Sequence, residues 1–209
     1  MNVLHCVAVL ALVGIPQADQ PPLALSGIDH AAQYLFDSAR DSAWPQAEEH
    51  LRELQRDVQN LPTNVAPADV VDSLRERLTQ LADTVPHHDR VKTMDAANAI
   101  TKYAMGLTDA FPSPVPAQLP RLAYLGRQIE LSVAAQDQNL FSRTVTDMRQ
   151  AWQELQPQLE GRGHAADQRR MTDIVVSLEV TTKLSDAEPL AREERDIVNR
   201  LASAFTTSN

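Results

Sequence analysis

The sequence has little glycine, few aromatic residues and no basic stripe. Its 209 residues include six glycines, and aromatic side chains make up 4%. Strand-rich folds need glycine in their tight turns, so the shortage favours helices. Scarce aromatic rings argue against a stacking surface for sugars or bases. Nucleic acid is not an expected partner either, because the net charge is −9 and the arginines alternate with carboxylates, as in Arg52, Glu53, Arg56, Asp72, Arg75, Glu76 and Arg77.

Catalytic sequence motifs are also missing. The chain has no G-x-S-x-G, no H-E-x-x-H and no G-x-G-x-x-G or phosphate-binding loop. Its paired carboxylates lie in charge-patterned segments such as "EEHLREL" and "EPLAREE", and we interpret the second as a helix first turn, where acidic residues favour the dipole. We therefore expect a protein that is not an enzyme.

The N-terminus carries the clearest local signal. An apolar run from Val7 to Ile15 has no charged residue before Asp19, and its length suits a secretory signal better than a membrane span. We predict a signal peptide over 1–18, with a retained N-terminal anchor as the alternative, followed by a tether over 19–26. The only cysteine is Cys6. Removal of the signal therefore leaves no disulfide, thiol nucleophile or covalent haem attachment and no membrane span, and places the protein outside the cell or in the periplasm.

The rest of the chain is patterned for helices. Apolar residues recur at steps of three and four, for example in the stripe Ala47, Leu51, Leu54, Val58 and Leu61. Short breaks such as "LPTNVAP" and "VPHHD" separate the stripes, which is typical of antiparallel neighbouring helices. We expect Pro189 to open the last helix, whose stripe is Ile197, Val198, Leu201 and Phe205.

One proline-rich segment divides the helical pattern into two. The stretch "FPSPVPAQLP" holds four prolines, and a helix cannot continue through it. An offset of about 94 residues lays Leu35 on Ile129, Leu51 on Val145 and Leu107 on Leu201, whereas the third helices need an offset nearer 100. The sequence therefore predicts an all-α fold of two four-helix repeats, 28–111 and 120–205, joined by a linker over 112–119 and packed as a bundle of about eight helices.

Four polar residues interrupt otherwise apolar or alanine-rich helix segments. They are Asn98 and Tyr103 in the fourth segment, and Arg127 and Glu130 in the fifth. Arg127 and Glu130 stand at i and i+3, the spacing of an ion pair within one helix, and a buried Asn98 would have to be hydrogen-bonded. We interpret all four first as packing residues, and second as weak candidates for a ligand site between the two halves.

A metal site is not expected. His87, His88 and Asp89 are the most metal-like cluster, but adjacent residues rarely reach one metal ion, and we interpret the segment as an exposed loop. No cofactor is expected. The first hypothesis for function is an exported module that binds another protein or regulates an envelope process. The alternative is a periplasmic bundle that binds a small ligand or metal between its halves.

Overall fold

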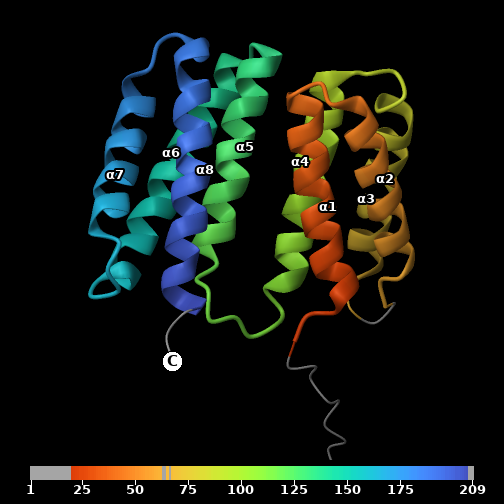
Figure 1. The fold of residues 1–209 in the computed structure, drawn as a ribbon, viewed down its shortest axis with the longest axis horizontal. Helices are drawn as coiled ribbons and strands as arrows, with labels where there is room; N and C mark the ends of the chain where they lie inside the picture. Colours follow the sequence, from red (N-terminus) through yellow and green to blue (C-terminus); the bar gives the residue numbers. More distant parts are fainter. Residues whose placement is uncertain (1–19, 63–64, 66, 207–209) are drawn as a thin grey trace, which may run out of the picture.

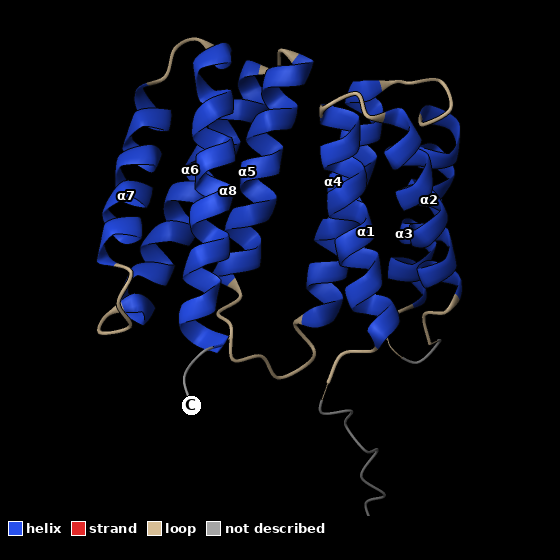
Figure 2. Ribbon diagram, viewed as in Figure 1, coloured by secondary structure: helices blue, strands red, loops and turns tan. Residues whose placement is uncertain are grey.

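The all-α prediction is confirmed. The computed structural model describes residues 20–62, 65 and 67–206, and this part of the chain contains eight α-helices and no strand (Figures 1 and 2). A short 3₁₀ turn, Gln156–Leu159, follows the sixth helix. The helices are α1 Leu23–Arg40, α2 Trp44–Gln59, α3 Ala68–Thr84, α4 Arg90–Thr108, α5 Gln118–Ala135, α6 Gln138–Leu155, α7 Ala165–Val180 and α8 Leu184–Thr206.

Local sequence explains where several helices begin. Pro22 and Pro67 occupy the N-cap positions of α1 and α3, where the missing N–H costs no helical hydrogen bond. The carboxylates of Asp89 and Asp137 cap α4 and α6 by accepting from the backbone N–H groups three residues on. Each cap satisfies a donor that the first turn of the helix leaves unpaired.

Two hydrophobic cores lie side by side (Figure 1). Helices α1 to α4 enclose the first core, around Leu35, Leu54 and Ile100, and α5 to α8 enclose the second, around Ile129, Met148 and Leu155. The first helix of each set packs on the second and fourth, and the third packs on its two neighbours. That common pairing agrees with the predicted halves, whereas a duplication of one ancestral unit stays a prediction.

The most extensive helix–helix contact between the halves is that of α5 with α4. Helix α5 lies along α4, and the segment of residues 109–117 connects the two helices at one end of the molecule (Figure 1). Leu131 of α5 is buried in the first core, with Ala134 and Leu140 packed against it. The halves therefore form one body, as expected from the limited core that each could build alone.

Two predicted boundaries are wrong. The tether predicted over 19–26 ends earlier, because α1 begins at Leu23 and already buries Leu25 in its first turn. Helix α8 begins at Leu184, so Pro189 lies inside it rather than opening it. The proline removes one backbone hydrogen bond, but Ala187 in the preceding turn is fully buried in the second core, and this packing extends the helix.

The predicted signal peptide over 1–18, with Cys6, lies outside the described residues. Among the helices that the structure describes, none combines the length and the apolar character needed to cross a bilayer. This finding concerns the described residues alone.

Leu54→Asp and Leu155→Asp test the two cores separately. Both leucines are fully buried, one in each core. Loss of a buried leucine costs about 2–5 kcal/mol, and burial of an unpaired carboxylate adds several kcal/mol more. We expect neither variant to fold cooperatively in thermal melts followed by circular dichroism. Gln153→Asp, on the exposed face of α6, is the control and should melt like the wild type. A normal melt of Leu155→Asp would show that its stripe is misassigned.

Candidate functional site

The two halves meet through polar stripes on α1, α5 and α8. Along α1, Asp29, Gln33, Asp37 and Arg40 recur at helical spacing beside the apolar stripe that fills the first core. Three of them form hydrogen bonds across the junction. Their partners are Arg127 and Glu130 of α5 and Arg195 of α8. The junction is therefore built from charged and amide groups as well as from apolar packing.

Four of these side chains form a closed set of alternating charges, here called the charge ring: Asp37, Arg40, Glu130 and Arg195. Asp37 accepts from Arg40 Nη1 at 2.8 Å and from both terminal nitrogens of Arg195 at 2.8 and 3.1 Å. Glu130 Oε2 accepts from Arg40 Nη1 at 3.0 Å. Glu130 Oε1 lies 3.3 Å from Arg195 Nη1 but lacks the alignment of a hydrogen bond. Each acid thus contacts both bases, and the ring is neutral as a whole.

Burial shapes the acidity of the ring. The carboxylate of Glu130 is 1% exposed. Burial raises its pKa above the ordinary value, and the guanidinium groups of Arg195 and Arg40 oppose only part of that rise. The hydrogen bond from Arg40 lowers the pKa of Asp41, which flanks the ring. Burying the ring therefore costs desolvation free energy, and the attraction within the ion pairs offsets that cost.

Arg127 does not form the ion pair with Glu130 that the sequence spacing favours. Its side chain is buried, and it binds amide oxygens of the other half. Nε donates to Asn98 Oδ1 at 3.3 Å, and Nη1 donates to Gln33 Oε1 at 3.4 Å. The two residues share a helix, but each has its partners on α1, α4 or α8, which the i, i+3 rule does not consider.

Those amides extend a chain of hydrogen bonds on both sides of Arg127. Gln33 Nε2 donates to Asp29 Oδ2 at 2.8 Å, and Asn98 Nδ2 donates to Gln128 Oε1 at 2.7 Å. Burial, with repulsion from Arg195, lowers the pKa of Arg127 to about 10, while Asp29, Asp37 and Glu194 oppose that shift. Arg127 is thus a buried cation held mainly by neutral groups.

Glu194 is a buried carboxyl that the sequence reading missed. It lies mid-way along α8, not in a first turn, it is fully buried, and neither carboxyl oxygen has a hydrogen-bond partner in the described part of the chain. Burial raises its pKa well above the ordinary value, and the nearby guanidinium groups of Arg195 and Arg127 oppose only part of that rise. One signal was available, because Glu194 falls on the buried stripe Ala187, Ala191, Glu194, Val198 and Leu201.

Gly126 makes room for this carboxyl. It stands on the buried face of α5, where Cβ of a larger residue would collide with Glu194 Oε2 and come within 2.8 Å of Arg195 Cγ. The absence of a side chain lets α5 and α8 approach while Glu194 packs between them. Glycine at this position is therefore a requirement of packing rather than of backbone conformation.

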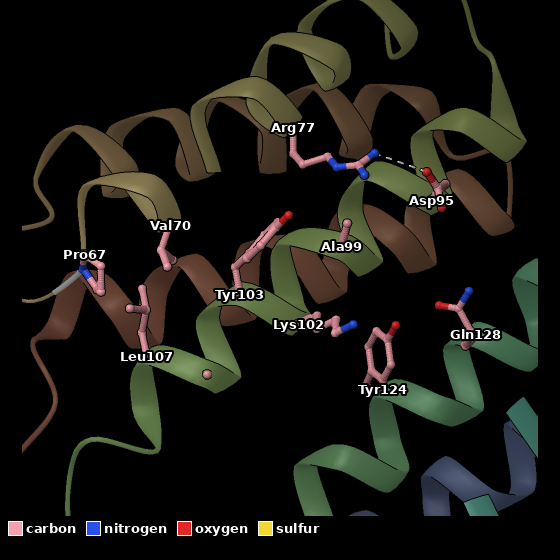
Figure 3. A pocket seen from close by; sticks show the side chains of 11 residues that line it. Pro67, Val70, Arg77, Asp95, Ala99, Lys102, Tyr103, Leu107, Tyr124 and Gln128 are labelled. Atoms are coloured by element: carbon pink, nitrogen blue, oxygen red, sulfur yellow. Dashed lines mark hydrogen bonds and ion pairs between the residues drawn. The ribbon is translucent and has the colours of Figure 1, made fainter. Parts of the chain in front are cut away.

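Two cavities open beside the junction. The first, the α1–α5–α8 cavity, has a volume of about 280 Å³ and is lined by Arg127, Arg195, Asp37, Gln33, Tyr34 and Asn199, among others. The second, the α3–α4–α5 groove, has a volume of about 500 Å³ (Figure 3). Tyr103 and Tyr124 project into the groove from α4 and α5, and Arg77 of α3 lies 3.5 Å from Asp95 across it.

The four candidate residues lie near the junction without forming one site. Asn98 and Arg127 bind each other, whereas Glu130 belongs to the charge ring. Tyr103 lines the groove, which Asn98 reaches only through Gln128. Arg40 and Arg195 complete the arrangement, and no sequence pattern distinguishes them from the other arginines.

The His87-His88-Asp89 segment divides its side chains among different partners. His88 stacks on Trp44, with ring centroids 4.7 Å apart, and His87 Nδ1 lies 2.6 Å from the backbone oxygen of Asp83. Asp89 caps α4. In the part of the chain that the structure describes, no three potential metal ligands gather at one place. The segment thus ties two turns of the first half together.

Glu130→Gln tests the charge ring. The variant leaves Arg195 with Asp37 as its carboxylate partner, and Arg40 with Asp37 and Asp41. We expect a loss of stability near the lower end of about 3–5 kcal/mol, because Arg40 and Arg195 remain 11% and 16% exposed. Urea unfolding measures it. The control is Glu154→Gln, which removes an exposed pair with Arg121 and should cost below about 1 kcal/mol. Equal losses of unfolding free energy in the two variants would show that the charge ring does not stabilise the fold more than an exposed ion pair does.

Glu194→Gln tests whether burial raises the pKa of this carboxyl. The folded protein keeps this proton above the ordinary pKa of 4.5, whereas the unfolded chain releases it, so wild-type stability falls as pH rises through that interval. Glutamine cannot ionise, and we expect the variant to melt above the wild type at pH 8, with the difference shrinking towards pH 5.

The neighbouring Glu193→Gln is the control with the opposite sign. Its bond from Arg170 lowers the pKa of Glu193, so that this carboxylate stabilises the fold above its ordinary pKa and loses the effect in acid. Glu193→Gln should therefore melt slightly below the wild type at pH 8. A Glu194→Gln variant that is also less stable at pH 8 would mean that Glu194 is ionised and paired.

No family model, curated protein or solved structure matches the chain. Its function has to be inferred from the groups that line the groove, the cavity and the junction between the halves.

Proposed function

We propose that the protein is an exported, non-enzymatic binding module that holds a segment of a partner protein in the α3–α4–α5 groove. The observation that carries this proposal is the lining of the groove, which combines two tyrosine rings, an apolar wall and cationic groups, and which draws side chains from both halves. Tyrosine and arginine are the residues that most often dominate protein–protein binding energy.

The lining indicates the kind of segment that fits. Val70, Leu107 and the rings of Tyr103 and Tyr124 offer contacts to apolar side chains. Arg77 already has Asp95 as a partner, whereas Lys102 is exposed at the groove and open to an acidic side chain. A short segment that presents aliphatic or aromatic residues beside an aspartate or glutamate is complementary to this surface.

Export and the absence of catalysis have separate support. The apolar run from Val7 to Ile15 is typical of a secretory signal. Glu194 has the most perturbed carboxyl, yet it packs on Gly126 and lines neither the groove nor the α1–α5–α8 cavity. Its perturbed acidity therefore has a packing explanation and does not by itself indicate a catalytic group.

Site-specific photo-crosslinking tests the groove. A benzophenone amino acid replaces Lys102 at the groove, or Gln153 on the exposed face of α6 as control, in cells that naturally make the protein. We expect one defined adduct from position 102 and none of that mass from position 153. The adduct should disappear in Gly106→Trp, because Gly106 lines the groove and no atom outside its own helix lies within 4 Å of its added Cβ. The same adducts from both positions would contradict the proposal.

A second candidate function is the binding of a small ligand between the halves. One observation favours it, namely that the α1–α5–α8 cavity is lined by the buried Arg127 and by Arg195. Small-molecule sites combine a concave shape with a few converging polar groups. The cavity meets that description independently of the groove.

A further inference from the structure

Arg127 lacks the counter-ion that the other junction arginines have. Arg40 and Arg195 each contact two carboxylates of the charge ring. Arg127 is 3% exposed, and in the described part of the chain it has no carboxylate within ion-pair distance, only the two amide oxygens at 3.3 and 3.4 Å. A buried charge without an opposite charge is costly, so the site favours an anion that supplies one.

The α1–α5–α8 cavity gives an anion access to Arg127. Arg127 lines this cavity together with Arg195, and its bonds to Asn98 and Gln33 use Nε and Nη1. The second terminal nitrogen, Nη2, has no hydrogen-bond partner among the described residues. A guanidinium edge with free N–H groups is shaped to bind a carboxylate or phosphate oxygen.

The charges of the lining select between those two groups. Arg127 and Arg195 carry two positive charges, and Asp37 carries one negative charge on the same wall. One negative charge balances the wall, whereas a phosphate dianion would add repulsion from Asp37. The volume of about 280 Å³ is just below the ~300–1,000 Å³ that is usual for small-molecule sites, so the ligand is small.

Apart from Ala123, the remaining lining residues are polar. Gln33 and Asn199 present amides, Tyr34 presents a hydroxyl, and His30 presents an imidazole. These groups hydrogen-bond hydroxyl or carbonyl substituents rather than a hydrocarbon chain. A ligand with one carboxylate and at least one hydroxyl group uses more of the lining than a simple fatty acid does.

We infer that the α1–α5–α8 cavity binds a small hydroxylated monocarboxylate, whose carboxylate contacts the free edge of the Arg127 guanidinium. This inference rests on the second candidate function and is independent of the groove. Binding needs no covalent step, and the anion supplies the charge that the protein leaves unmatched.

Thermal unfolding with defined anions tests the inference. Lactate, acetate and inorganic phosphate are titrated at constant ionic strength. For the wild type we expect a saturable rise in melting temperature with lactate, a weaker response to acetate and the weakest to phosphate. In Arg127→Met the apparent affinity for lactate should fall at least about tenfold, as expected for loss of a charge-assisted hydrogen bond. The exposed Arg200→Met should respond like the wild type.

A second variant keeps the test valid if Arg127→Met does not fold. Asn199 is exposed at the cavity, so Asn199→Trp should obstruct the cavity while leaving Arg127 in place and the unliganded melting temperature unchanged. It should lose the lactate response. A lactate response that is unchanged in Arg127→Met or Asn199→Trp, a preference for phosphate, or no response in the wild type would overturn the inference. The crosslink from position 102 should persist in Asn199→Trp, so that failure of the groove and failure of the cavity are told apart.

Discussion

The pairing of Asp37, Arg40, Glu130 and Arg195 is the constraint on which the arrangement of the two halves depends. Each half has a core of its own, and outside the α4–α5 contact few apolar side chains cross between them. Apolar packing is tolerant of small rotations, whereas the two ion pairs of the ring that cross between the halves, Arg40–Glu130 and Asp37–Arg195, have fixed partners and are not. A neutral ring also avoids the cost of a net buried charge, which a single arginine or glutamate at this junction would incur.

The ring has consequences for the groups around it. Because its arginines are already matched, Arg127 is left with amide partners, and Glu194 is left between Gly126 and Arg195 without a hydrogen bond. The junction thus combines matched charges, a cation without a carboxylate partner and a buried carboxyl without a hydrogen bond. The cavity and the groove both lie beside this region. The sites proposed for binding therefore adjoin polar groups whose hydrogen bonds the surrounding helices do not fully supply.

The helices could be predicted from the sequence, whereas most side-chain contacts between the two halves could not. Steps of three and four, as in Leu51, Leu54 and Val58, report one face of one helix, and that information was sufficient for the fold. Asn98, Arg127 and Glu130 stood out because they interrupt apolar stretches. Their partners did not, because helical spacing says nothing about which stripe of α1 faces α8. Glu194 was not recognised because it stands among Arg192, Glu193 and Arg195, a run of charges that is typical of a solvent-exposed helix face.

The amide of Asn98 ties the two openings together. Its oxygen serves Arg127, which lines the cavity, and its nitrogen serves Gln128, which lines the groove. Asn98 is fully buried, so no water replaces a lost partner without entering the helix junction. If the Arg127 guanidinium shifts towards a ligand in the cavity, Asn98 Oδ1 loses its hydrogen-bond donor. A rotation of the Asn98 amide that restores this bond would break the bond from Asn98 Nδ2 to Gln128 at the groove. If both openings bind as proposed, occupancy of one would change the affinity of the other, and by thermodynamic reciprocity the effect would be equal in both directions.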